Sequence, residues 1–467
     1  MNVILHLGLG SFHRAHQAVY LQALHDRGDR RWELAGGHIR ADMPETIAAL
    51  QAQGGAYTLE TISPHNEHAY QRISSIRRVV GYTPDLAGLV AIAVQPATKI
   101  ISFTVTEAGY YLDAKNRLNF DTFADLRADL AALRGGALAD GTRSWTIYGA
   151  LTALLRARKA AGAGQVTLLN CDNLRHNGER SRSGLLQYIA QLGDAELRAW
   201  VEANTTSPNS MVDRITPRPT RAVRERVKAA TGIDDPAAVM GESFIQWVIE
   251  DDFIAGRPAW ESAGAEMVTS VQAHEEAKVR LLNATHSCIA WAGTLVGYTY
   301  IHEGTLDPAI RQMAHDYVTN DVMPVLRPSP IDLAAYRDVV LKRFGNAAIA
   351  DTNQRVAMDG FSKIPGFIAP TIRERLARGD PIDSAAMLPA LFLAYLRMWH
   401  QGGITYAYLD QAMNPVAAHA MCDAADPMAV FCADALLWGP LTGDARLVQA
   451  LRGASARVER FVEQHRA

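Results

Sequence analysis

The spacing of hydrophobic and polar positions changes along this chain at about residue 270. Before that point, short apolar runs such as residues 3–7 and 34–39 alternate with segments of helical periodicity. Near-continuous apolar runs of this length are typical of parallel strands that are covered on both faces. From residue 274 onward the period is helical, most clearly around residues 308–323, 332–343, 385–400 and 444–465. The pattern predicts an α/β domain over residues 1–270 and a mostly α-helical domain over residues 271–467.

A glycine turn follows the first predicted strand and opens a helix. The turn contains Gly8 and Gly10, followed by Ser11 and Phe12. Strand, glycine turn and helix start together form a phosphate cradle, because the glycines let the backbone approach the anion. The third glycine of the dinucleotide fingerprint is missing, since His13 occupies that position. We therefore predict a Rossmann-type domain in which these two glycines, Ser11 and Phe12 bind a dinucleotide.

Polar residues also follow the second predicted strand. Asp42 is the candidate for holding the ribose hydroxyls of the cofactor, whereas Arg40 could accept the 2′-phosphate of NADP. These two residues do not decide whether the cofactor is NAD or NADP, although NAD is favoured.

Two further apolar runs, residues 98–107 and 165–169, end in polar residues. Ligands of open α/β sheets bind outside the carboxyl ends of the strands, where Glu107 and Asn173 are expected. We predict that Glu107 contacts the cofactor and that Asn173 belongs to the active site. The alternative for each is an ordinary turn-forming or helix-capping residue.

A polar stripe marks the helix expected at the junction of the two domains. At 100° per residue, Lys278 is at 0°, Glu275 at about 60°, His286 at about 80° and Asn283 at about 140°. The helix continues into the apolar residues 288–296, so we expect the stripe to face a cleft instead of bulk solvent. Polar groups in such a place need partners, and a substrate can supply them.

Composition restricts the classes of function and the cellular location. The chain has 467 residues, enough for two domains, and its net charge of -3 provides no basic surface for nucleic acid or an anionic membrane. Its four cysteines are far apart, and neither a signal peptide nor a membrane-spanning run is apparent. We expect a cytoplasmic protein.

Several stretches carry a resemblance to a known family. They are residues 8–16, 104–110, 171–173 with 177–178, 209–215, and Lys278 with Asn283 and His286. In order and spacing they resemble the long-chain mannitol dehydrogenase family, as far as about residue 370. Residues 60–64, 169–173, 244–251 and 351–357 resemble the branch that oxidises D-arabinitol. The resemblance implies nicotinamide-dependent, metal-independent oxidation of a sugar alcohol, here D-arabinitol to D-xylulose.

The resemblance also implies roles for individual residues. Lys278 matches the general base, and Asn173 and Asn283 match the pair that holds the developing alkoxide. Positions that bind or orient the substrate are matched by His286, Asp213, Arg355 and Lys363, and a position near the proton route is matched by Glu275. Phe361 departs from the family pattern, because relatives often carry a smaller polar residue there.

These residue types suit the reaction that the resemblance implies. The nicotinamide accepts the hydride, and a base must take the hydroxyl proton. The pKa of a free lysine is about 10.4, and burial or a nearby cation lowers it, whereas a carboxylate such as Glu275 raises it. Two amide donors can stabilise the charge that builds on oxygen. Zinc would need Cys and His ligands, and Cys171 with His176 is the nearest approach, so we expect no metal.

Alternatives remain within and outside the family. A mannitol 2-dehydrogenase or a hexuronate reductase would share the fold, and the anionic substrate of the latter calls for additional basic residues in the cleft. An inactive nucleotide-binding sensor is expected to lack some of the catalytic residues, whereas here Lys278, both asparagines and His286 are all present. We expect a small-molecule polyol or ketose as partner. The polar loops at residues 135–143 and 327–331, together with the resemblance, favour a monomer.

Overall fold

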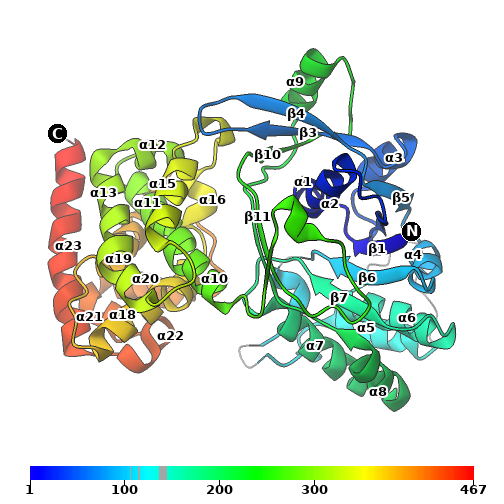
Figure 1. Cartoon of the computed structure of the whole chain (residues 1–467). Coiled ribbons are helices and arrows are strands. Elements are labelled where there is room, and N and C mark those ends of the chain that lie inside the picture. The colour runs from blue at the N-terminus through cyan, green and yellow to red at the C-terminus, as the bar shows by residue number, and fades with distance from the viewer. Residues whose placement is uncertain (106, 114–115, 136–144, 467) are drawn as a thin grey trace. The chain divides into compact units, whose positions relative to one another are not determined.

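The computed structural model describes residues 1–105, 107–113, 116–135 and 145–466, and for Glu107, Ala108 and Arg466 it describes the backbone alone. Contacts between residues divide the chain into two compact units (Figure 1). Unit 1 comprises Met1–Ser63 and Glu67–Gln272, and unit 2 comprises Pro64–Asn66 and Ala273–Ala467. Of the two predicted loops, residues 136–143 lie outside the described part, and residues 327–331 contain no helix or strand.

Unit 1 is built on a six-stranded parallel sheet. Its spatial order is β5 (Ile76–Val80), β2 (Trp32–Gly37), β1 (Asn2–Leu7), β6 (Thr98–Phe103), β7 (Val166–Asn170) and β8 (Thr205–Thr206). Numbered along the chain, these strands follow the order 3-2-1-4-5-6 of the doubly wound dinucleotide-binding fold. The order reverses between β1 and β6, so a crevice opens at the carboxyl ends of these two strands. The predicted Rossmann-type fold is confirmed.

Helices cover both faces of this sheet (Figure 1). They are α1 (Ser11–Ala15), α2 (Gln17–Asp26), α3 (Pro44–Ala52), α4 (Ala87–Ala93), α5 (Ala124–Leu133), α6 (Ile147–Ala160), α7 (Asn177–Leu192) and α8 (Ala195–Asn204). A further helix, α9 (Arg221–Thr231), packs against the hairpin of residues 57–73 instead. Along β1, Val3, Leu5 and Leu7 enter the core that includes α4 to α8, whereas Ile4 enters the core that includes α1 to α3. Alternate residues point to opposite faces, which explains the unbroken apolar run.

Two small sheets complete unit 1. One has the order β10 (Val239–Glu242), β3 (Tyr57–Ile62), β4 (His68–Ile73), and the other has the order β12 (Glu266–Val268), β11 (Gln246–Glu250), β9 (Ser210–Asp213). The hydrophobic pattern did not predict the β3–β4 hairpin, because four of the six residues of β4 are exposed and polar or small. Two predicted strands also end earlier than expected, β2 at Gly37 and β6 at Phe103.

Unit 2 is helical, as predicted. Its elements are α10 (Gln272–Ala277), η3 (Lys278–Asn283), α11 (Ala284–Leu295), α12 (Ile301–Leu306), α13 (Pro308–Asp316), η4 (Tyr317–Val322), α14 (Met323–Leu326), α15 (Leu333–Phe344), η5 (Ala347–Ile349), α16 (Asn353–Ala357), α17 (Gly360–Lys363), η6 (Ile364–Ile368), α18 (Ala369–Ala377), α19 (Met387–His400), α20 (Pro415–Asp423), α21 (Pro427–Cys432), α22 (Ala435–Trp438), η7 (Gly439–Leu441) and α23 (Ala445–Arg466). The segments η3, η4 and η6 are π-helical.

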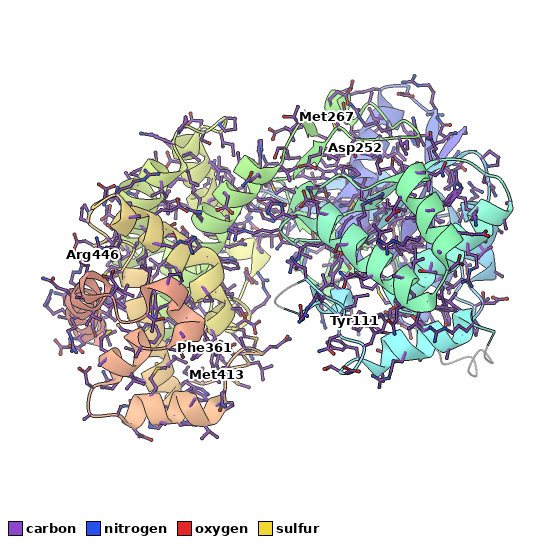
Figure 2. The ribbon with its side chains drawn as sticks, turned by 90° about the horizontal axis from the view of Figure 1, so that it is seen from below. Tyr111, Asp252, Met267, Phe361, Met413 and Arg446 are labelled. Carbon is purple, nitrogen blue, oxygen red and sulfur yellow. The ribbon has the colours of Figure 1, made fainter. Side chains whose placement is uncertain are left out.

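The core of unit 2 surrounds α11 and α19. Along α11 every residue except His286 is buried, so this helix runs through the middle of the unit. Phe361, labelled in Figure 2, also belongs to this core. Its ring packs edge-on against Phe392 at 5.7 Å between centroids. Its aromatic side chain therefore fills the interior. In the described part of the chain, no helix is both long and apolar enough to cross a lipid bilayer.

Candidate active site

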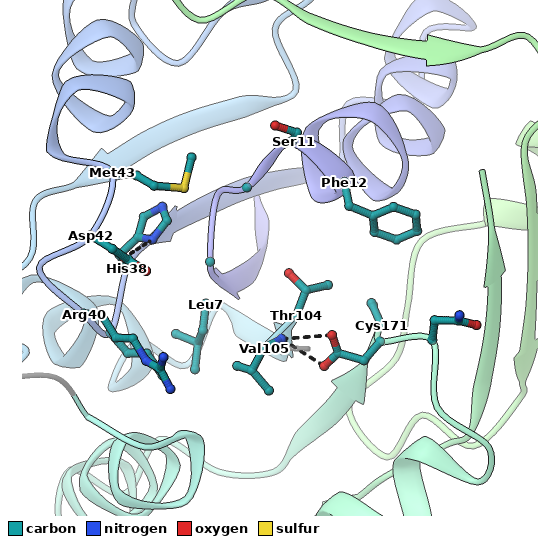
Figure 3. A pocket seen from close by; sticks show the side chains of 15 residues that line it. Leu7, Ser11, Phe12, His38, Arg40, Asp42, Met43, Thr104, Val105 and Cys171 are labelled. Carbon is teal, nitrogen blue, oxygen red and sulfur yellow. Dashed lines mark hydrogen bonds and ion pairs between the residues drawn. The ribbon is translucent and has the colours of Figure 1, made fainter. Parts of the chain in front are cut away.

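A cavity of about 550 Å³ lies at the carboxyl ends of the parallel strands of unit 1 (Figure 3). Its lining consists of Leu7, Gly8, Gly10, Ser11, Phe12, His38, Ile39, Arg40, Asp42, Met43, Thr104, Val105, Cys171, Asp172 and Asn173. Six residues predicted from the sequence are therefore brought to one cavity: Gly8, Gly10, Ser11, Phe12, Asp42 and Asn173. The cavity is at the point where the strand order reverses, which is where such sheets bind ligands.

The two glycines of the turn after β1 meet different requirements. Gly8 has φ +107, and a Cβ there would lie 3.0 Å from the carbonyl oxygen of Thr104. Its conformation and its closeness to the next strand both require glycine. A Cβ on Gly10 would meet nothing within 4 Å, although the residue lines the cavity. The absence of a side chain at Gly10 therefore leaves room for a ligand to approach the backbone.

Asp172 connects the loops that follow β6 and β7. Its carboxylate accepts hydrogen bonds from the backbone N–H of Val105 at 3.0 and 2.9 Å and from the Tyr110 hydroxyl. This network holds the backbone beside Asn173, which lies at the cavity rim. Asp172 was not predicted from the sequence as a site residue, although it lies two residues after the end of β7, a buried strand.

Polar and charged residues of the loop that follows β2 line one end of the cavity. His38 Nδ1 lies 3.0 Å from Asp42 Oδ1, and Arg40 Nη2 donates to the Tyr111 hydroxyl at 3.4 Å (Figure 3 shows His38, Arg40 and Asp42 together). Burial lowers the pKa of His38, and Asp42 opposes this only in part. A neutral ring leaves the negative charge of Asp42 uncancelled, and this carboxylate is half-exposed. His38 was not predicted from the sequence as a site residue. The one signal for it was its spacing of four residues from Asp42.

Glu107 was predicted to contact the cofactor. It begins the 3₁₀ turn η1 (Glu107–Tyr110), and its side chain lies outside the described residues.

His13, which replaces the third glycine, is fully buried. Its ring stacks on His6 at 3.5 Å between centroids, and its Nδ1 lies 3.2 Å from Oε1 of Gln17. Gln17 Nε2 in turn lies 3.0 Å from Nδ1 of His16, whose Nε2 faces the backbone oxygen of Gln246 at 2.8 Å. Burial lowers the pKa of His13 to about 3. These hydrogen-bonded side chains fix the start of α2. They begin at His13, the position at which a dinucleotide-binding fold ordinarily has glycine.

In unit 2, Lys278 begins the π-helical segment η3 and Asn283 ends it. Lys278 is 5% exposed and Glu275, three residues earlier in α10, is equally buried. The prediction of one α-helical stripe at 100° per residue was wrong here, because a π-helix hydrogen-bonds from i to i+5 and winds differently. The angles expected between Lys278 and Asn283 or His286 therefore do not apply. Single π turns inside α-helices are frequent at functional sites.

Two predicted substrate residues, His286 and Arg355, contact the carboxylate of Asp351, which was not predicted from the sequence as a site residue. His286 Nε2 lies 3.3 Å from Asp351 Oδ2, and Arg355 binds the same carboxylate with two nitrogens at 2.6 and 2.5 Å. Lys363 Nζ donates to the backbone oxygen of Val356 at 2.6 Å. The His286 ring also stacks on Phe344 at 4.1 Å.

The charges of this cluster follow from its geometry. Burial lowers the pKa of His286, with Asp351 opposing and the cations Arg355 and Lys363 adding to the effect. Burial alone would raise the pKa of Asp351, but His286 and Arg355 bring it below its ordinary value. At neutral pH the cluster therefore holds a neutral imidazole, a carboxylate and a guanidinium. The sequence offered one signal for Asp351, its spacing of four from Arg355 at a helix start.

Asp213 lies at the end of β9 and is buried. It stands opposite Gln246 in the antiparallel pairing of β9 with β11. Among the described residues, no group of three or more His, Cys, Asp or Glu side chains is arranged to hold a metal ion.

Comparisons with known proteins agree with this architecture. A family model described as the mannitol dehydrogenase Rossmann domain matches residues 2–262, and one described as the mannitol dehydrogenase C-terminal domain matches residues 270–458. A D-arabinitol 4-dehydrogenase of Ralstonia nicotianae is 59% identical over 460 residues, covering 98% of this chain and 96% of that protein. A D-arabinitol 4-dehydrogenase of Klebsiella pneumoniae is 51% identical over 454 residues, covering 97% of each.

A solved structure is similar over nearly the whole chain. It is the Pseudomonas fluorescens mannitol 2-dehydrogenase in a ternary complex with NAD and D-mannitol, with 33% identity and a TM-score of 0.82. The match covers 99% of this chain and 94% of that one.

Proposed function

Because this chain belongs to the mannitol dehydrogenase family, a family of polyol dehydrogenases, we propose that it oxidises D-arabinitol to D-xylulose with NAD. The observation that carries the substrate is the similarity to two D-arabinitol 4-dehydrogenases, at 59% and 51% identity over nearly the full length of each. The mannitol 2-dehydrogenase is less similar, at 33%. D-Mannitol is therefore the second candidate substrate.

The cavity of unit 1 fits a nicotinamide dinucleotide. Gly8 holds the turn after β1 close to Thr104, and the open side of Gly10 leaves space for the pyrophosphate against the backbone. Asp42, half-exposed at one end of the cavity, would accept hydrogen bonds from the ribose hydroxyls, which favours NAD, whereas Arg40 beside it could hold the 2′-phosphate of NADP. Ser11, Phe12 and Glu107 complete the proposed cofactor contacts. When bound, the nicotinamide accepts the hydride from the substrate carbon.

Lys278 is the proposed general base. Its amine is withdrawn from bulk water, since the residue is 5% exposed, and it occupies an irregular turn of the kind common at functional sites. In the oxidation, Lys278 takes the proton of the reacting hydroxyl. Glu275, one turn earlier, is proposed to lie on the route by which this proton reaches solvent.

Amide donors would stabilise the reacting oxygen, and a polar cluster would bind the other hydroxyls of the substrate. Asn173 and Asn283 are proposed to donate hydrogen bonds to the developing alkoxide, a contribution that is typically a few kcal/mol for each donor. The proposed residues for orienting and binding the remaining hydroxyls are His286, Asp213, Arg355 and Lys363. Of these, His286 and Arg355 bind Asp351.

The proposed residue roles assign the cofactor and the substrate to different parts of the chain. Residues 1–270 would bind the cofactor and residues 271–467 the substrate, with the catalytic helix at the junction. We further propose a metal-independent monomer in the cytoplasm, a location that suits four cysteines without a disulfide.

Activity on a small substrate panel tests the proposal. Purified protein would be assayed for NAD and NADP reduction with D-arabinitol, D-mannitol, D-sorbitol, xylitol and mannitol 1-phosphate, with and without a chelator. We expect chelator-resistant NAD reduction with the highest kcat/KM on D-arabinitol. A maximum on D-mannitol would move the function to the second candidate. No oxidation of any polyol with either cofactor would contradict the proposed activity and favour an inactive nucleotide-binding protein.

A further inference from the structure

Asp351 is in contact with two of the proposed substrate residues at the same time. Its side chain is 10% exposed, and its Oδ2 lies close to both His286 Nε2 and Arg355 Nη2. We propose that Asp351 sets the charge of the substrates that this site accepts, by neutralising Arg355 and by fixing the tautomer of His286. This inference rests on the proposed function, because it concerns the substrate of that same site.

The backbone holds Asp351 firmly in place. Its carbonyl oxygen accepts from the N–H of Ile301 at 2.9 Å, and Thr352 forms an isolated β-bridge with Tyr300. Thr352 also caps α16, with its hydroxyl accepting from the N–H of Arg355 at 3.3 Å. The carboxylate of Asp351 is therefore fixed one turn before Arg355 by contacts that do not involve His286.

The first effect of Asp351 is on charge. Arg355 gives two nitrogens to one carboxylate, and a bidentate pair of this kind is the strongest arrangement for these groups. His286 is neutral, so the three side chains carry no net charge. A guanidinium that is compensated in this way can still donate hydrogen bonds to neutral hydroxyls, but it offers little attraction to a carboxylate. An anionic substrate would also be repelled by Asp351 itself.

The second effect is on the imidazole of His286. His286 Nε2 is buried and lies 3.3 Å from the Asp351 carboxylate, without hydrogen-bond geometry. A lone pair at this distance would be repelled by the carboxylate and an N–H would be attracted, so the tautomer with the proton on Nε2 is favoured. The proton is therefore on Nε2, and Nδ1 is left as an acceptor. Within the part of the chain that the structure describes, His286 Nδ1 makes no hydrogen bond. It can accept one from a substrate hydroxyl, which a polyol supplies at every carbon.

These two effects separate neutral from anionic substrates. A sugar alcohol or ketose offers hydroxyl donors to Nδ1 and hydroxyl acceptors to Arg355. A hexuronate adds a negative charge that finds no uncompensated partner among His286, Asp351 and Arg355, and Lys363, whose Nζ donates to the backbone oxygen of Val356, is the remaining cation near them. Asp351 acts through its neighbours, so it is a positioning residue and not a catalytic one.

Substitution of Asp351 by Asn tests the charge effect. The change keeps the size of the side chain and leaves Arg355 uncompensated, so we expect the ratio of kcat/KM for D-fructuronate to that for D-xylulose, both reduced with NADH, to rise about tenfold. Asp338→Asn is the matched control, since Asp338 pairs with Arg337 on the exposed surface of α15, and its ratio should not change. Asp351→Glu keeps the charge and should stay close to the wild-type ratio.

Two further measurements separate this role from simple structural support. In the double variant Asp351→Asn, Arg355→Gln the gain on fructuronate should disappear, because the uncompensated cation is gone. By NMR of histidine-labelled protein, Asp351→Asn should lower the pKa of His286 further, since the carboxylate that opposes burial is lost. If Asp351→Asn does not fold, Arg355→Gln alone must lower the fructuronate ratio.

The outcomes are distinct. Equal losses on both substrates with an unchanged His286 pKa would overturn the inference and make Asp351 a structural residue. Failure of the wild-type protein to oxidise any polyol would instead contradict the proposed function. A rise in the ratio that persists in the double variant would also overturn the inference, because the gain would not come from Arg355.

Discussion

At the scale of single residues, the candidate site depends on polar groups that are buried beside specific partners. Asp172 holds two loops of unit 1 together by accepting from the backbone N–H of Val105 and the Tyr110 hydroxyl, and Asp351 contacts His286 and Arg355 in unit 2. Neither aspartate was identified from the sequence as a site residue, because one Asp letter does not reveal which distant group it faces. Lys278 was identified, since the family resemblance assigns a role to its position.

The role of Lys278 leads to the first prediction at this scale. Lys278→Ala removes the proposed general base, so kcat should fall about 10³-fold. Because the proposed cofactor residues belong to the cavity of unit 1, the Kd for NAD should change little. Stopped-flow reduction of NAD and a fluorescence titration would measure the two quantities.

Lys342→Ala is the control for this variant, because Lys342 is an exposed lysine of the same helical unit. Its kcat should match that of the wild type. A Lys278→Ala protein that keeps its kcat but loses affinity for NAD would show that the lysine is not the base.

At the scale of elements, helix contacts decide where the proposed substrate residues stand. The short helix α17 carries Lys363 at its end and starts at Gly360, which lies against α19. A Cβ at Gly360 would fall inside the van der Waals radius of the Phe392 ring. Small residues of this kind permit close helix contacts that no larger side chain allows.

Gly360→Ala should therefore destabilise unit 2. Overpacking of a core typically costs about 1–3 kcal/mol, so we expect a lower Tm, together with a raised KM for the polyol as Lys363 moves. Differential scanning calorimetry and steady-state kinetics would measure both effects. Gly453→Ala in α23 is the matched control, since a Cβ there meets nothing within 4 Å and alanine is the better helix former. A Gly360→Ala protein as stable as the control would contradict this account of the α17 contact.

The helical period in the sequence predicted that unit 2 is helical but not where its helices change type. The run 308–323 reads as one helix, whereas the structure has α13 up to Asp316 and the π-helical η4 after it. The same change at Lys278–Asn283 altered the angles within the proposed site. A π turn contains about one residue more than an α turn and shifts the helical period by a single position, which is too small a change for the apolar spacing to reveal.

At the scale of the whole molecule, each unit has its own core, and the core of unit 1 contains neutral histidines. In the unfolded chain a histidine binds a proton below about pH 6.5, whereas His13 in the folded protein has a pKa of about 3. Between these values the unfolded state binds more protons, so the free energy of unfolding rises with pH by at most about 1.4 kcal/mol per pH unit for one such residue. This stabilisation is complete above about pH 6.5 and is lost as the pH falls toward 3.

We predict that Tm decreases between about pH 7 and about pH 5, and that His13→Gln reduces this decrease. Glutamine has no titrating ring, so the difference between variant and wild type should grow as the pH is lowered. Calorimetry at several pH values would measure it. The exposed His419, substituted by Gln, serves as the control and should keep the wild-type pH dependence. A His13→Gln protein with that same dependence would mean that His13 is not the neutral group that we describe.

The sequence by itself determined the class of each part of this protein and its family. Apolar runs and helical periods depend on local side-chain spacing, which is why the Rossmann-type sheet and the helical unit were predicted correctly, and the motifs around Gly8 and Lys278 marked the family. Tertiary structure decided the rest. The partners of Asp172 and Asp351, the stacking of His13 on His6 and the close contact at Gly360 depend on residues of other strands, helices or loops. Such contacts arise from the packing of whole elements, and no local pattern of residues encodes them.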